Sequence, residues 1–202
     1  MFPQFRNLLA GAVLALTVAA PATAQFSDSY NFLTAVRSSD GEKVTKALQG
    51  TRASIVNTKD YGTGETALII TIKRRDMTWS NFLLGRGANP NLKDNKGNSA
   101  LHYAALLGFQ EGAALLLGQG AQVNAVNSGG ESPLIVAVQQ RDVGMVRLLL
   151  ASGGDPRLPD RIAGKSARDY AADDPRAAAV LKIIDESKTA VKAKPKVAGP
   201  SM

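Results

Sequence analysis

The sequence contains no cysteine and a single histidine, His102. Without cysteine there can be no disulfide, thiolate nucleophile, cysteine-bound zinc or lipid anchor on cysteine. A metal site needs several convergent ligands, and one histidine without a ligand cluster does not provide them. We therefore expect neither a metal nor another cofactor.

Long apolar runs are also scarce. The one candidate, residues 8–20, has thirteen residues, whereas a membrane-spanning helix needs about 20. Arg6 precedes this run and Ala22-Thr23-Ala24 follows it, and these three parts together are typical of a secretory signal peptide. We predict that residues 1–24 are removed on export, with the periplasm as the simplest destination and secretion or an uncleaved anchor as alternatives.

Acidic residues are absent from the last sixteen positions, which hold four lysines. The formal net charge of +7 is therefore concentrated in residues 187–202, and the remaining body is close to neutral. A balanced body does not resemble a nucleic-acid-binding domain, in which basic residues cluster on one face. We expect the tail to be disordered. An alternative function is that this tail holds the protein to an anionic polymer or lipid.

The body contains a repeat with a period of 33 residues. Residues 94–126 run from a polar turn through a short apolar helix, a break at Gly108 and a second helix to an exit at Asn124. Residues 61–93 and 127–159 align with this stretch without a gap, and looser copies occupy residues 27–59 and 160–186. Atypical end copies are expected in a stacked array. We predict one repeat domain over residues 25–186.

Within residues 99–105 the sequence SALHYAA resembles the ankyrin-repeat signature T-P-L-H-x-A. Related runs begin at Thr66 and Ser132, and exits of the G-A-D-V-N kind occur at residues 87–91 and 120–124. The resemblance implies an all-α ankyrin-repeat solenoid of about five helix-turn-helix units joined by β-turn fingers. It also implies a concave face, formed by fingers and inner helices, that binds other proteins.

His102 occupies the histidine slot of this signature. We expect its ring to bond to nearby backbone and to the Ser99 hydroxyl, which would brace adjacent turns. The alternative is a hydrolase that uses His102 as a general base, but a base needs a nucleophile or an oriented water beside it. Trp79 falls in a second helix, where core packing is the simpler expectation. We therefore predict that the protein is not an enzyme.

The repeat pattern leaves certain inner-helix positions free to vary, and these are the predicted partner-binding residues. Their order predicts a face that is basic at the amino end, apolar at the centre and acidic at the carboxyl end. Exposed apolar patches with polar rims mark interaction sites. The positions are Ile70, Lys73, Arg74, Tyr103, Leu106, Leu107, Val136, Gln139, Gln140, Tyr170, Asp173 and Asp174.

Three of these residues, Tyr103, Leu106 and Leu107, are expected to form the central patch; the alternative is that Leu106 and Leu107 tuck between repeats. Residues of the fingers, such as Tyr61 and Asn127, are secondary candidates. The predicted function is a monomeric, non-enzymatic protein-binding module of the cell envelope, acting as a scaffold, protector or inhibitor. Its partner is another protein.

Overall fold

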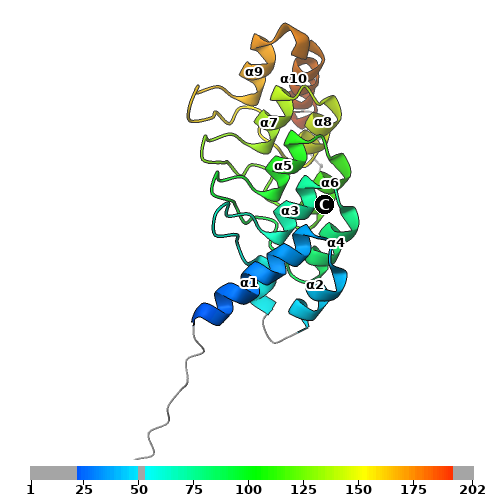
Figure 1. Cartoon of the computed structure of the whole chain (residues 1–202). Coiled ribbons are helices and arrows are strands. Elements are labelled where there is room, and N and C mark those ends of the chain that lie inside the picture. Colours follow the sequence, from blue (N-terminus) through cyan, green and yellow to red (C-terminus); the bar gives the residue numbers. More distant parts are fainter. Residues whose placement is uncertain (1–21, 50–52, 193–202) are drawn as a thin grey trace, which may run out of the picture.

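Five helix pairs stack into an elongated array in the computed structural model, which describes residues 22–49 and 53–192 (Figure 1). No strand forms in these ranges beyond isolated β-bridges. The elements are α1 (Ala22–Arg37), α2 (Gly41–Leu48), η1 (Ala53–Asn57), α3 (Ala67–Lys73), α4 (Met77–Gly85), α5 (Ala100–Leu106), α6 (Gln110–Gly118), α7 (Pro133–Gln139), α8 (Val143–Ala151), α9 (Ala167–Asp173), η2 (Pro175–Ala177) and α10 (Ala178–Lys192).

The first helix of each pair lies beside a row of projecting turns, the fingers, and the second helix lies on the far side (Figure 1). The inner helices α3, α5 and α7 contact one another in sequence, and α5 also contacts its own outer helix α6. The prediction of an all-α ankyrin-type solenoid is therefore confirmed.

The core repeats with the same period as the sequence. Leu68, Leu101 and Leu134 in the inner helices are buried, as are Leu83, Leu116 and Leu149 in the outer helices. Burying one leucine side chain stabilises a fold by about 1.5–3 kcal/mol, and each of these side chains is in the single cluster that runs through the array. Trp79 packs, partly buried, against this cluster and meets the Phe82 ring edge to face.

Local sequence sets where each helix begins. The hydroxyls of Thr66 and Ser132 accept the N–H of Ile69 and Ile135, each at 3.3 Å, and Pro133 follows Ser132 at the first helical position. Side-chain caps of this kind satisfy backbone N–H groups that have no partner within the helix. Asp40, Asp76 and Asp142 cap the outer helices α2, α4 and α8 in the same way.

Each finger begins with an acid or amide whose Oδ1 accepts the N–H two residues later. Asp60, Asp94, Asn127 and Asp160 do so at 2.7–2.9 Å. The ungapped alignment had placed Tyr61 opposite Asp94, and that register is wrong for this turn: Asp60 takes the role, and Tyr61 is exposed at the tip. The finger between Asp60 and Thr66 is thus one residue longer than the finger that begins at Asp94.

Neighbouring fingers are joined through their backbones. The N–H groups of Asn95, Ser128 and Arg161 donate to Thr63, Lys96 and Gly129, respectively, at 2.9–3.1 Å. The row of fingers is therefore a bonded ladder.

A second ladder uses the asparagine at the exit of each repeat. The amides of Asn57, Asn91 and Asn124 each donate to the carbonyl of a glycine one repeat later (Gly87, Gly120 and Gly153) at 3.0–3.1 Å. Each amide oxygen also accepts a backbone N–H of that repeat, at 2.7–2.8 Å. Arg157 occupies the equivalent position one repeat after Asn124, and no further repeat with a glycine exit follows it.

The two ends depart from the sequence predictions. The prediction of a disordered tail from residue 187 is wrong at its start, because α10 continues to Lys192; residues 193–202 lie outside the described residues. The predicted leader lies there too, apart from its last three residues, which begin α1. Across the described ranges, no helix is both long and apolar enough to cross a membrane.

Candidate protein-binding face

The inner helices and the fingers form one face, called here the inner face, and the predicted site residues lie on or beneath it. Six are exposed: Lys73, Arg74, Leu106, Gln139, Gln140 and Asp173. Four are partly buried: Tyr103, Leu107, Tyr170 and Asp174. Two are buried: Ile70 and Val136. The inner-helix positions that vary in sequence are therefore not all free for a partner.

The prediction that Ile70 and Val136 are open to a partner is wrong for Ile70, and for Val136 it holds only where that side chain borders a pocket. Both are less than a tenth exposed, at 7% and 8%. They occupy the middle of α3 and α7, which pack against the next inner helices, α5 and α9. Their apolar side chains belong to the core.

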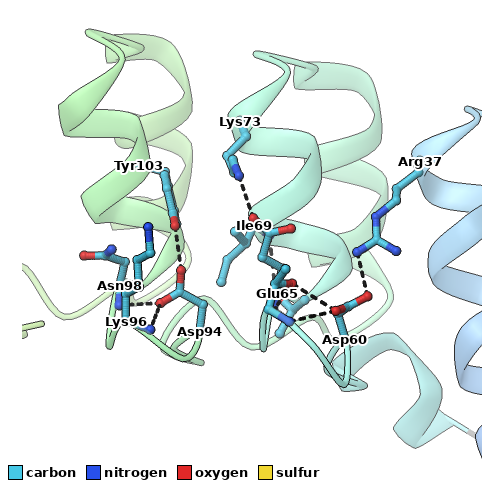
Figure 2. Close-up of polar contacts among 11 residues, drawn as sticks. Arg37, Asp60, Glu65, Ile69, Lys73, Asp94, Lys96, Asn98 and Tyr103 are labelled. Atoms are coloured by element: carbon cyan, nitrogen blue, oxygen red, sulfur yellow. Dashed lines mark hydrogen bonds and ion pairs between the residues drawn. The ribbon is translucent and has the colours of Figure 1, made fainter. Parts of the chain in front are cut away.

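Tyr103 is at the corresponding position of α5, but its longer side chain reaches the finger. Its hydroxyl donates to Asp94 Oδ2 at 2.6 Å, and Lys73 Nζ lies 5.1 Å from the ring centroid. Burial and the bond to Asp94 raise the pKa of Tyr103 to about 12. Figure 2 shows this phenol directed at the Asp94 carboxylate, whose Oδ1 also accepts the N–H groups of Lys96 and Asn98.

The same link recurs at the end of the array, where the Tyr170 hydroxyl donates to Asp160 Oδ2 at 2.7 Å. This bond, together with burial, raises the pKa of Tyr170 to about 12. Both tyrosines connect an inner helix to its finger. The prediction that Tyr103 belongs to an exposed central patch is therefore wrong in part, because the ring is partly buried and its hydroxyl is already bonded to Asp94.

The charges predicted for the amino end are paired within the chain. Lys73 Nζ lies 2.5 Å from Glu65, and Arg37 lies 2.8 Å from Asp60 (Figure 2). Backbone donation from Thr63, followed by the Arg37 contact, lowers the pKa of Asp60 to about 2. Arg74 donates to the carbonyls of residues 36 and 37 at the end of α1 and also contacts Asp76.

The acidic carboxyl end is paired as well. Asp173 lies 2.9 Å from Lys165 Nζ, and Asp174 lies 2.7 Å from Arg141 and 3.2 Å from Arg176. The backbone N–H of Arg176, followed by the Arg141 side chain, lowers the pKa of Asp174 to about 2. The predicted gradient of charge is present in sequence, but each of these charges already has a partner.

The centre of the inner face contains a pocket of about 140 Å³ between α5 and α7. Leu106 at its edge is 46% exposed, whereas Leu107 packs partly buried against the core. The two leucines therefore behave differently, and only Leu106 is available as predicted. The pocket is lined by Asn98, His102, Tyr103, Leu106, Asn127, Glu131, Val136 and Gln139.

The prediction missed Asn98 and Glu131, which complete the pocket from the fingers. Each stands directly before the capping serine of an inner helix, at Ser99 and Ser132. That position was the available signal, because the residue before the cap is the last one of the finger. The predicted site residues all follow a cap, so neither Asn98 nor Glu131 was among them.

His102 forms the floor between these two repeats. Its Nδ1 accepts the backbone N–H of Ser99 at 3.1 Å and contacts the Ser99 hydroxyl at 2.9 Å, and its Nε2 contacts the Glu131 carbonyl at 3.1 Å. Burial lowers the pKa of His102 to about 4, so the ring is neutral at pH 7. The predicted bracing role is confirmed.

The Ser99–His102 contact also resembles a nucleophile–base pair, but its surroundings argue against catalysis. Both residues are 2% exposed, so no substrate atom can reach the hydroxyl. The second ring nitrogen is occupied by a backbone carbonyl, where a triad would place a carboxylate. In the described part of the chain, no three His, Cys, Asp or Glu side chains are grouped as metal ligands would be.

Comparison with known proteins agrees with this architecture. A family model for ankyrin repeats in three copies matches residues 32–127 and 81–160. An ankyrin repeat-containing protein of Treponema pallidum is 36% identical over 109 residues, which cover 54% of this chain and 36% of that protein. The mouse B-cell lymphoma 3 protein homolog is 35% identical over 97 residues, covering 46% of this chain and 22% of its own length.

The human ankyrin repeat domain-containing protein 13C is 45% identical over 65 residues, which cover 32% of this chain and 12% of that protein. The chain thus spans about a third or less of the length of these relatives. Ankyrin repeats generally mediate protein–protein interaction and are typically non-catalytic. From its stacked helix pairs, its finger ladder and the family match over residues 32–160, this chain belongs to the ankyrin-repeat family.

Proposed function

We propose that this protein binds a partner protein through the centre of the inner face, around Leu106, and that it does so in the cell envelope. The observation that carries the first part is the exposure of Leu106 beside a pocket, since no other large apolar side chain of α3, α5, α7 or α9 is exposed. An exposed apolar side chain in a polar rim is a common centre for binding energy.

The polar surroundings favour recognition over self-association. Asn98, Asn127 and Gln139 supply amides at the rim of the pocket, and such groups give an interface its specificity when a partner matches them. The finger ladder and the tyrosine links hold these residues in place. A rigid surface loses little conformational entropy on binding, which favours affinity.

The test is affinity capture with a pair of matched variants. Leu106→Glu places a charge at the centre of the inner face and is expected to abolish capture of the partner. Val143→Glu is the control: Val143 is similarly exposed, at 36%, but starts the outer helix α8, where an acidic residue is compatible with the helix dipole. If both variants retain the same partners as the wild type, the proposed binding face is wrong.

The envelope location rests on the leader-like sequence of residues 1–24. Fusion of an export-dependent reporter enzyme after Glu186 tests it directly. We expect reporter activity with residues 1–24 present and loss of activity when they are deleted. Equal activity in both fusions would contradict export through this segment.

A further inference from the structure

In three repeats the residue before the cap of the inner helix contacts the residue eight positions later, and these pairs differ in charge. In the repeat of α3 the pair is Glu65 and Lys73, at 2.5 Å, and in the repeat of α9 it is Lys165 and Asp173, at 2.9 Å. These two repeats thus close the space between finger and helix with an ion pair. The two central repeats do not.

In the repeat of α7 the same register holds Glu131 and Gln139. Gln139 Nε2 donates to Glu131 Oε1 at 3.0 Å, and Asn127 Nδ2 donates to Glu131 Oε2 at 2.8 Å. Both contacts come from neutral amides. Within residues 22–49 and 53–192, no basic side chain lies within ion-pair distance of this carboxylate.

The carboxylate of Glu131 is held rigidly at the pocket. Asn127 Oδ1 accepts the backbone N–H of Glu131 at 2.9 Å, and His102 Nε2 lies 3.1 Å from its carbonyl. Two amides then orient the carboxylate oxygens. Each oxygen has a further lone pair, because a carboxylate can accept about four hydrogen bonds and these two contacts use only two.

Other charges near the pocket do not neutralise Glu131. Lys73, which stacks on the Tyr103 ring, is paired with Glu65. Asp94 adds a second negative charge behind the Tyr103 hydroxyl. His102 is neutral at pH 7. The pocket therefore presents a negative charge next to the apolar surface of Leu106 and Val136.

We propose that this pocket receives a basic side chain of the partner protein, with its aliphatic stem against Leu106 and Val136 and its cationic head group on Glu131. The inference rests on the proposed function of the inner face. Lysine and arginine combine an apolar stem with a charged end, and an ionic hydrogen bond to a carboxylate is stronger than a neutral one. The occupant takes the place that Lys73 fills for Glu65 in the chain's own second repeat.

The test uses two small probes and nuclear magnetic resonance of the full chain. N-acetyl-arginine amide carries the cation, and N-acetyl-citrulline amide is its neutral isostere. The arginine probe is expected to shift the side-chain amide resonances of Asn127 and Gln139, which contact Glu131. The citrulline probe is expected to bind about tenfold more weakly, because its neutral head group cannot form a charge-assisted hydrogen bond with Glu131. Equal affinity for the two probes overturns the proposal.

Three variants locate the effect. Glu131→Gln removes the charge and should weaken binding of the arginine probe about tenfold, whereas Glu111→Gln, at an exposed position in the first turn of the outer helix α6, should leave the affinity unchanged. Gln139→Lys should also abolish probe binding, since it supplies an internal cation in the register of Lys73. Wild-type affinity in both Glu131→Gln and Gln139→Lys contradicts the proposal.

Partner capture separates this inference from the function on which it rests. If Leu106→Glu loses the partner while Glu131→Gln keeps it, the inner face binds a protein but the pocket does not bind a basic side chain of that protein. If Leu106→Glu keeps the partner, the proposed function itself fails, whatever the probes do. Loss of the partner in both variants, with Glu111→Gln unaffected, supports both.

Discussion

The imidazole of His102 in α5 donates its Nε2 proton to the Glu131 carbonyl oxygen, 3.1 Å away in the next finger. The direction follows from the other ring nitrogen, which accepts the Ser99 N–H and therefore carries no proton. One neutral ring thus joins the start of one inner helix to the finger of the next repeat. Protonation would replace the acceptor at Nδ1 with a second donor and break this arrangement.

Burial of this ring makes the folding stability depend on pH in a defined window. The pKa of His102 is lowered from 6.5 to about 4 in the folded chain, so the unfolded state takes up a proton first as pH falls. The contribution of neutral His102 to the free energy of unfolding is complete above pH 6.5 and is lost progressively towards pH 4. At 1.36 kcal/mol per pKa unit, this contribution totals about 3 kcal/mol. Urea unfolding at several pH values measures it.

The variant His102→Asn serves as the control for this titration. It removes the ionisable group, so the slope between pH 6.5 and pH 4 should flatten, even though overall stability is lower. Asp60 and Asp174 have lowered pKa values, so their contributions are lost only below about pH 4 and do not overlap this window. An unchanged slope in His102→Asn would show that another group is responsible.

The asparagine ladder predicts a position-dependent effect. Asn91→Ala removes two inter-repeat hydrogen bonds, to the Gly120 carbonyl and from the Gln122 N–H, and should lower the free energy of unfolding by about 1–2 kcal/mol. Arg157→Ala is the matched control at the same repeat position, where the side chain is exposed and no glycine exit follows. Its effect should be close to zero. Equal losses would show that the ladder bonds do not account for the difference.

The finger glycines predict a contrast between the interior and the end of the array. Gly97 and Gly164 both have positive φ, 77° and 66°, so alanine at either position strains the backbone by about 1–2 kcal/mol. A Cβ on Gly97 would lie 2.5 Å from the Ser128 nitrogen, whereas a Cβ on Gly164 meets nothing within 4 Å. Gly97→Ala should therefore destabilise more, by at least about 1 kcal/mol. Thermal or urea unfolding of both variants tests the order.

The tyrosine link can be tested separately from binding. Tyr103→Phe removes the 2.6 Å hydrogen bond to the buried Asp94 carboxylate and should cost about 1.5–3 kcal/mol of stability. Tyr61→Phe, at a side chain that is 95% exposed, should cost nothing measurable. Because the ring of Tyr103 remains, the phenylalanine variant should still capture the partner. Loss of capture without loss of stability would restore Tyr103 as a direct anchor.

Much of the fold was predictable because its rules are local. The helix starts at Thr66 and Ser132 follow from hydroxyl capping, and the brace at His102 follows from its place in the signature. The buried leucines recur every 33 residues because each repeat covers the next. These features depend on residues within one repeat or at one fixed period.

The candidate site was less predictable, because it depends on what the neighbouring repeat covers. Ile70 and Val136 vary in sequence like surface residues, but both are buried in the core of the stacked repeats. The role of Asp60 could not be seen in an ungapped alignment, since one extra residue in the finger shifts the register of the turn. Glu131 was missed because it is distinguished only by what lies opposite it. Its contact at that position is the neutral Gln139, whereas Glu65 is paired there with the basic Lys73.

The 33-residue repeat, its helix boundaries and the family are encoded locally, because periodic burial and capping each depend on only a few residues. Only the tertiary structure decided which inner-face residues remain available: Leu106 and Glu131 are available, whereas Ile70, Arg74 and the Tyr103 hydroxyl are not. The physical reason is that burial and charge pairing in a stacked array are set by contacts between repeats. The local pattern of one repeat does not specify which groups the next repeat brings within reach.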